Sequence, residues 1–145
     1  MYDAVMAFFQ KTDIAVLSAA VADFRPEMVA DQKIKKNPEN DTFTIKLVKT
    51  EDILKSVGKI KTENQTVVGF ALETENGLEN AKKKLHTKNI DLIVLNEMNE
   101  SGVGFKTKTN KISIITKNDE VTSYELKPKN EVATDILKAI YQYIN

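Results

Sequence analysis

The sequence predicts an α/β fold, in which a three-layer, Rossmann-like and mostly parallel sheet carries an antiparallel hairpin extension. Three short apolar runs, at residues 14–20, 66–71 and 90–95, are typical of buried parallel strands. A helical pattern over residues 75–88 separates the second run from the third, and this strand-helix-strand order favours parallel pairing. Residues 111–126 contain two alternating segments around a polar turn, which predicts the hairpin.

The other helices are predicted from apolar residues at helical spacing. Apolar residues between Ala4 and Phe9 share one face, so the chain opens inside an amphipathic helix. Thr50 is expected to cap a helix at residues 51–59, because two acidic residues follow it and suit a first helical turn. The core faces are expected to hold Leu78, Ala81 and Leu85 in the helix at 75–88, and Val132, Ile136, Leu137, Ile140 and Tyr143 in a helix at 131–144.

A long segment at residues 21–41 shows no apolar periodicity and contains Pro26, Pro38 and a cluster of lysines. Loops of this length inside a compact domain are usually functional or disordered, so we expect a flexible active-site flap. After it, residues 42–48 alternate apolar and polar side chains, which predicts a half-buried strand.

Composition excludes several classes of function. The 21 basic and 21 acidic residues cancel, so no global field recruits nucleic acid or an anionic membrane. The absence of Cys excludes a disulfide framework, and with His86 as the only histidine it argues against zinc and the common nucleophilic triads. His86 itself is expected on the surface without a partner. No apolar stretch approaches the span of a bilayer, so a cytoplasmic protein is expected.

Two groups near the first strand could carry chemistry. Asp23 follows the strand directly, where a carboxylate can reach a bound metal and phosphate, although a turn or capping residue is an equal alternative. Lys33, Lys35 and Lys36 form a charge run of the kind that is more often solvated than functional. A mobile loop with lysines can nevertheless close over a triphosphate and neutralise charge that develops at phosphorus.

A second set of candidates lies later in the chain. Lys84 and Lys88 are four residues apart on a predicted helix, so two ammonium groups share a face and could grip one anion. Sequence alone favours two exposed lysines of no consequence. Phe70, at the end of the second strand, is most simply a core residue. The glycines of residues 102–105 are weak evidence for phosphate binding.

Taken in order, AAVADFRP, KIKK, LVKTEDIL, VGFALETEN, the pair Lys84 and Lys88, DLIVLNEM and GVGF resemble a known family. It is the phosphopantothenoylcysteine synthetase domain of the bacterial bifunctional coenzyme A biosynthesis enzyme, and the resemblance covers residues 1–145. It implies a ligase that joins 4′-phosphopantothenate to cysteine through a CTP-derived acyl-nucleotide, with Mg²⁺ as its cofactor and a homodimer as its assembly. FMN would belong only to the decarboxylase domain, which this chain does not contain.

The resemblance also implies site residues. Lys33 holds the position that contributes to the chemistry, and Asp23 the position beside the metal. Phe70 and residues 51–54 would form the base pocket, with Glu51 where proline is common, a change that mainly affects backbone preorganisation. The nucleotide-binding set that the resemblance implies is Ser18, Ala19, Ala20, Asp23, Lys33, Glu51, Asp52, Ile53, Leu54, Phe70, Lys84 and Lys88.

The family's earlier glycine-rich region and its Asn have no counterpart in this sequence. We therefore expect residues 1–145 to form a single truncated domain, without its N-terminal elements and inactive in isolation. The alternative is a non-catalytic nucleotide-binding or dimerisation module, in which an exposed edge at residues 111–116 pairs with another subunit. The choice between CTP and ATP stays open.

Overall fold

The computed structural model describes residues 1–35, 42–97 and 108–145. The chain divides into two compact units, the first made of Met1–Ser18 and Ile53–Asn145 and the second of Ala19–Asp52. In the described ranges, no helix combines the length and apolar character that crossing a membrane requires.

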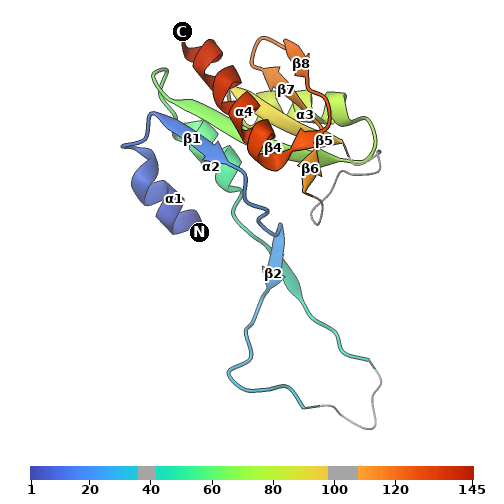
Figure 1. Ribbon diagram of the computed structural model, residues 1–145. Coiled ribbons are helices and arrows are strands. Elements are labelled where there is room, and N and C mark those ends of the chain that lie inside the picture. Colours follow the sequence, from blue (N-terminus) through green and yellow to red (C-terminus); the bar gives the residue numbers. More distant parts are fainter. Residues whose placement is uncertain (36–41, 98–107) are drawn as a thin grey trace. The chain divides into compact units, whose positions relative to one another are not determined.

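A five-stranded sheet forms the centre of unit 1 (Figure 1). Its order is β1 (Ile14–Leu17), β4 (Thr66–Glu73), β5 (Leu92–Glu97), β7 (Ile112–Thr116) and β8 (Val121–Ser123). The first three strands are parallel, whereas β7 and β8 join them in antiparallel ladders. A separate antiparallel pair consists of β6 (Thr109–Asn110) and β9 (Lys127–Pro128). The predicted α/β class with its hairpin extension is therefore confirmed.

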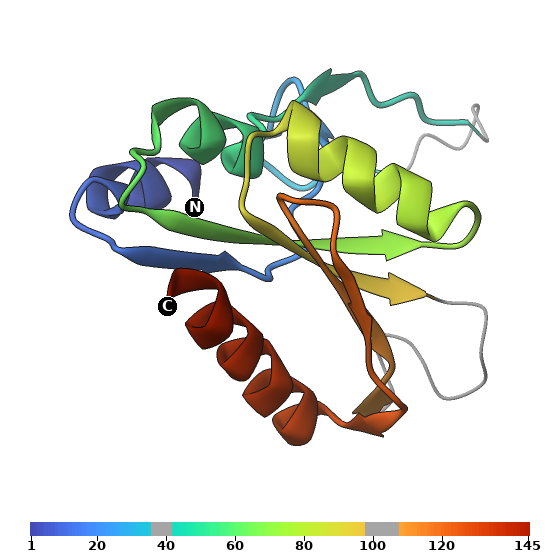
Figure 2. The same ribbon diagram turned by 90° about the horizontal axis from the view of Figure 1, so that it is seen from above.

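Helices cover both faces of this sheet, which gives three layers (Figure 2). One face carries α1 (Tyr2–Phe9), α2 (Ile53–Ile60) and α3 (Gly77–Thr87), and the other carries α4 (Lys129–Ile144). Because side chains alternate along a strand, β4 sends Val67 and Ala71 into the first layer of core and Val68 into the second.

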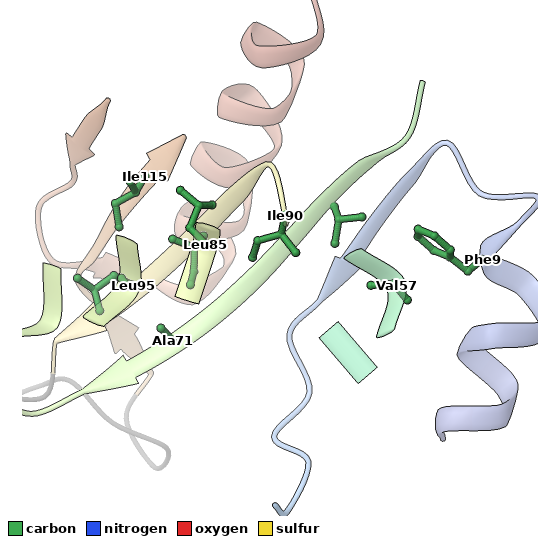
Figure 3. Close-up of a cluster of buried hydrophobic side chains, with 10 residues drawn as sticks. Phe9, Val57, Ala71, Leu85, Ile90, Leu95 and Ile115 are labelled. Carbon is green, nitrogen blue, oxygen red and sulfur yellow. The ribbon is translucent and has the colours of Figure 1, made fainter. Parts of the chain in front are cut away.

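The core cluster under α1, α2 and α3 is drawn in Figure 3. It consists of Phe9, Val57, Val67, Ala71, Ala81, Leu85, Ile90, Ile93, Leu95 and Ile115. Burial of a large aliphatic or aromatic side chain contributes roughly 1.5–3 kcal/mol, so this cluster is a main source of the unit's stability. The cluster under α4 consists of Val68, Leu92, Val94, Ile112, Ile114, Val132, Ile136 and Ile140.

The first strand differs from its prediction. β1 ends at Leu17 rather than at residue 20, and Ile14 and Val16 are exposed instead of buried. The physical reason is its place in the sheet: among the described residues, β1 pairs with β4 alone and is an edge strand.

The expectation that residues 111–116 form an exposed edge of the sheet is also wrong. β7 lies between β5 and β8, so its backbone groups are used on both sides and it offers no free edge to another subunit. The hairpin turn is closed by hydrogen bonds from the Thr116 N–H to the Glu120 carbonyl and from the Asp119 N–H to the Thr116 carbonyl.

Two residues assigned to helix core faces are exposed. Leu137 follows Ile136 by one residue, and the helical rotation of about 100° turns it away from the buried stripe of α4. Leu78 lies in the first turn of α3, at the end of the stripe that Ala81 and Leu85 bury.

Unit 2 contains two short strands, β2 (Phe24–Pro26) and β3 (Leu47–Lys49), in antiparallel register. The sequence missed β2, and the strand expected at residues 42–48 is shorter and exposed rather than half-buried. Within the described residues, β2 and β3 pair only with each other, so neither belongs to the large sheet. β2 and β3 therefore form a separate two-stranded sheet within unit 2.

Thr50 does not cap α2 in the expected way, because the helix begins three residues later at Ile53. Its hydroxyl donates to the Ala22 carbonyl at 2.6 Å, and its N–H donates to the Asp23 carbonyl at 2.9 Å. Thr50 thus joins the two ends of the segment that carries β2 and β3.

Candidate functional site

The predicted site residues are divided between the two units. Unit 1 holds Ser18, Ile53, Leu54, Phe70, Lys84 and Lys88, and unit 2 holds Ala19, Ala20, Asp23, Lys33, Glu51 and Asp52. In unit 1, Ser18 directly follows β1, Ile53 and Leu54 begin α2, and Phe70 lies inside β4. Lys84 lies in the last turn of α3 and contacts Glu73 at the carboxyl end of β4, where open α/β sheets bind ligands, whereas Lys88 is the C-cap that leads towards the amino end of β5.

The start of α2 packs directly on β4. A Cβ on Gly69 would lie 2.6 Å from Leu54 Cδ2 and 2.9 Å from Ile90 Cδ1, so a larger residue would force these two side chains to shift. Ile53 is buried, and Leu54 packs against the cluster under α1, α2 and α3. The close contact holds the first turn of α2 against β4.

Phe70 lies inside β4, which continues to Glu73, rather than at the end of the strand as expected. Its partly buried ring packs against the cluster under α4. Leu54, by contrast, packs on the other face of the same strand. Unit 1 therefore places these two members of the predicted base pocket on opposite faces of β4.

Lys84 is held by an acidic residue that the sequence analysis did not single out. Lys84 Nζ donates to Glu73 Oε1 at 2.5 Å, and the two side chains are 44% and 14% exposed. The Asn80 amide donates to the other carboxylate oxygen, Oε2, at 3.3 Å. Glu73 is the last residue of β4, so the pair joins the carboxyl end of this strand to α3. The sequence signal for Glu73 is the first of the two glutamates in VGFALETEN.

Lys88 ends α3, and its N–H donates to the Lys84 carbonyl at 3.0 Å. Its own carbonyl packs on α2: a Cβ on Gly58 would lie 1.8 Å from the Lys88 oxygen. The amide of Asn89, a residue with φ of 51°, donates to the Gly58 carbonyl at 2.8 Å. The helix that carries both lysines is therefore locked against α2, whose first residues belong to the predicted base pocket.

In unit 2, Asp23 and Lys33 are exposed. The Asp23 carbonyl accepts the Thr50 N–H, which fixes its backbone beside β2. Lys35 is also exposed, whereas Lys36 and the glycine turn at 102–105 lie outside the described residues. In the ranges that the structure describes, no three acidic or histidine side chains gather into a metal cluster. A single exposed carboxylate suits Mg²⁺, which usually keeps several waters and is shared with substrate phosphates.

A buried ion pair at the other end of the sheet is the largest feature that sequence reasoning missed. Lys61 Nζ lies 2.7 and 2.8 Å from the Asp91 carboxylate oxygens, and both side chains are less than a tenth exposed, at 8% and 6%. The Val67 N–H donates to Asp91 Oδ2 at 2.8 Å. Burial raises the pKa of the nearby Tyr143, and the Asp91 charge raises it further. The available signal was an aspartate directly before an apolar strand.

Two smaller observations complete the geometry. His86 is exposed as expected but has a partner, because its Nε2 lies 3.1 Å from Asp119 Oδ1 on the hairpin turn. Asn96 Oδ1, near the end of β5, accepts a hydrogen bond from the Asn110 amide at 2.8 Å.

Comparison with known proteins supports the resemblance. Residues 1–144 match the model of the DNA/pantothenate metabolism flavoprotein C-terminal domain. A cysteine/cysteine sulfinic acid decarboxylase from an unknown prokaryotic organism is 46% identical over all of this chain and 40% of its own length. The coenzyme A biosynthesis bifunctional protein CoaBC of Bacillus subtilis is 41% identical over 97% of this chain and 34% of its own length.

A solved structure agrees with these relatives. The crystal structure of the C-terminal domain of a coenzyme A biosynthesis bifunctional protein CoaBC matches with a TM-score of 0.73 and 38% identity, over 97% of this chain and 61% of that one. The chain thus spans about a third to two-fifths of the curated relatives' length. Because the family model covers all but the last residue, the chain belongs to the DNA/pantothenate metabolism flavoprotein C-terminal domain family.

Proposed function

We propose that this chain forms the nucleotide-binding part of a phosphopantothenate–cysteine ligase of coenzyme A biosynthesis. The observation that carries the proposal is the 41% identity to the Bacillus subtilis bifunctional protein over 97% of this chain. The position of Lys84 beside Glu73 at the carboxyl end of β4 supports it, since anions and nucleotides bind at this edge of open α/β sheets.

The proposed reaction has two steps. The carboxylate of 4′-phosphopantothenate attacks the α-phosphorus of CTP, and pyrophosphate leaves with the electron pair of the broken P–O bond. The cysteine amine then attacks the mixed anhydride, so that an amide forms and CMP leaves. Activation is needed because a free carboxylate is a poor electrophile.

The chain's own residues have separate roles in this proposal. Lys84 and Lys88 bind phosphate oxygens, and the backbone at the start of α2 recognises the base. Phe70 was expected to join this pocket, but its ring packs on the opposite face of β4 from Leu54. Lys33 stabilises negative charge that develops on phosphorus and on the leaving pyrophosphate. Asp23 would hold Mg²⁺ together with the nucleotide phosphates, and the ion when bound supplies further charge neutralisation.

A homodimer in the cytoplasm is also part of the proposal. Unit 2 exposes a group of large apolar side chains: Phe24, Met28, Val29, Ile34, Phe43, Ile45 and Leu47. Exposed apolar groups of this size are typical of interfaces between proteins. Sedimentation equilibrium of this chain should give a dimer, and a monomer at high micromolar concentration would contradict this part.

The nucleotide step is tested by titration of CTP into this chain in the presence of Mg²⁺, with ATP as the comparison. CTP is expected to bind more tightly than ATP. If neither nucleotide binds at millimolar concentration, the proposed nucleotide site is wrong.

The complete reaction is tested in a chimera, in which this chain replaces the matching 140 residues of the Bacillus subtilis protein. With phosphopantothenate, CTP, Mg²⁺ and cysteine, the chimera should release pyrophosphate and form phosphopantothenoylcysteine. Binding of CTP without product would favour the alternative, a non-catalytic nucleotide-binding or dimerisation module.

Lys33→Gln in the chimera tests the role of the flap lysine. It should lower kcat by more than it raises the KM for CTP, because its charge acts mainly in the transition state. Lys35→Gln is the matched control, since Lys35 lies two residues away and is equally exposed. An equal loss in both variants would contradict a specific role for Lys33.

A further inference from the structure

Glu73 occupies a position that the proposed function leaves unexplained. It is mostly buried at the end of β4, yet its carboxylate contacts the ammonium group of Lys84, one of the two lysines that we place on the nucleotide phosphates. Asn80 binds the second carboxylate oxygen, so the carboxylate is held from two sides by α3.

The side chains of Glu73 and Lys84 differ in how freely they can move. Glu73 is 14% exposed and belongs to β4, which pairs with a strand on each side, whereas Lys84 is 44% exposed on a long flexible side chain. The carboxylate is therefore the fixed member of the pair. The ammonium is the member that can move, and two of its three donors are available for further acceptors.

On the basis of the proposed nucleotide site, we propose that Glu73 is a positioning residue that acts as the exchangeable counter-ion of Lys84. Without ligand, Glu73 holds the ammonium at the carboxyl end of β4. A phosphate chain binds by taking that ammonium over, and Glu73 takes it back when pyrophosphate leaves. Glu73 thus opposes anion binding through Lys84 and favours release.

The opposite role, in which Glu73 strengthens binding by ordering Lys84, predicts the opposite sign. Glu73→Gln keeps the size of the side chain and a carbonyl acceptor for Asn80, but removes the charge that neutralises Lys84. If Glu73 gives up Lys84 to the ligand, Glu73→Gln should bind anions more tightly than the parent. If Glu73 instead strengthens binding by ordering Lys84, Glu73→Gln should bind anions more weakly. Direct repulsion between Glu73 and the ligand would also tighten binding, but it would not depend on Lys84.

The experiment is a double-mutant cycle on this chain, with inorganic pyrophosphate and CTP as separate probes in calorimetric titrations. Glu73→Gln should bind both probes about five-fold more tightly than the parent, and the gain should shrink in high salt. In the Lys84→Met background, Glu73→Gln should change affinity by less than two-fold. In the chimera, Glu73→Gln should lower the KM for CTP and slow pyrophosphate release.

Asp135→Asn is the matched control, because Lys127 and Asp135 form an ion pair of similar exposure, 33% and 14%, at 2.7 Å on elements without predicted site residues. It should leave both affinities unchanged. Weaker binding by Glu73→Gln, or tighter binding that persists with Lys84→Met, would overturn the exchange.

The two probes separate this inference from the proposed function. Pyrophosphate binding that tightens on Glu73→Gln, with no binding of CTP, would support the exchange and contradict the nucleotide site. CTP binding that is equal in the parent and Glu73→Gln would contradict only the exchange. Failure of both probes to bind either protein would overturn both.

Discussion

Two lysine-carboxylate pairs lie at opposite ends of the same sheet and differ in nearly every physical respect. Lys61 and Asp91 are buried at the amino ends of β4 and β5, with a backbone N–H as a further partner of the carboxylate. Lys84 and Glu73 lie at the carboxyl end, where the lysine is nearly half exposed. A buried pair has no solvent to exchange with, whereas an exposed lysine can change partners at low cost. We therefore expect the pair at the amino end to stabilise the fold, and the pair at the carboxyl end to take part in the proposed ligand binding.

The largest expected change in stability follows from removing the buried ion pair between Lys61 and Asp91. Asp91→Ala leaves the Lys61 charge and the Val67 N–H without their partner, and should lower the free energy of unfolding by about 3–5 kcal/mol. Urea denaturation measures this change. The double variant Lys61→Met, Asp91→Leu should recover part of the loss, because no buried charge then remains, although the Val67 N–H still lacks its acceptor. A loss below about 1 kcal/mol for Asp91→Ala would show that the amino end is not the stabilising end.

At the carboxyl end the same kind of change should affect binding instead. Lys84→Ala should weaken CTP binding by about 1.5–3 kcal/mol, as expected for a charged hydrogen bond. Its cost in unfolding free energy should stay below about 1 kcal/mol, because Lys84 is nearly half exposed and Glu73 keeps its hydrogen bond from Asn80. Titration at two salt concentrations and urea denaturation provide the two measurements.

Lys83→Ala is the control for this variant, since Lys83 is the exposed neighbour on α3. Equal CTP affinity of Lys84→Ala and the parent at low salt would remove Lys84 from the site.

Gly58 lies on α2, which runs between the two ends of the sheet. Its substitution therefore tests stability and nucleotide binding together. A Cβ there would meet the Lys88 carbonyl oxygen at 1.8 Å, so α2 and α3 must move apart. Gly58→Ala should cost about 1–3 kcal/mol of unfolding free energy by overpacking. It should also weaken CTP binding, because the lysine helix shifts relative to the start of α2.

Lys59→Ala, on the exposed side of the same helix, should change unfolding free energy by less than about 0.5 kcal/mol. A Gly58→Ala variant as stable as the parent would show that the two helices are not in tight contact.

The smallest effect concerns pH. Burial, with the Asp91 charge, raises the pKa of Tyr143 above its ordinary 10.0. The unfolded chain therefore loses the tyrosine proton first as pH rises, so stability should fall from about pH 10 upward until the folded-state pKa is passed. Tyr143→Phe should flatten this fall in thermal unfolding curves recorded between pH 9 and pH 11. If stability depended on pH in the same way in Tyr143→Phe and the parent, Tyr143 would not be coupled to the Lys61–Asp91 pair.

The sequence by itself determined the elements whose signals are local. Apolar periodicity indicated α1, β4, α3, β5, the hairpin and α4, because side-chain spacing follows from the geometry of a single helix or strand. The motifs in their order also indicated the family, which the match over residues 1–144 confirms. Their assignment of nucleotide-binding residues stays a prediction.

Only the tertiary structure decided which surfaces meet. It made β1 an edge strand and β7 an interior one, although both are similar apolar runs. It paired Lys61 with Asp91 across 30 residues and Glu73 with Lys84 across 11, and it placed Leu54 and Phe70 on opposite faces of β4. Such contacts depend on strand order and helix packing, which join residues far apart in the chain and leave no periodic trace in the sequence.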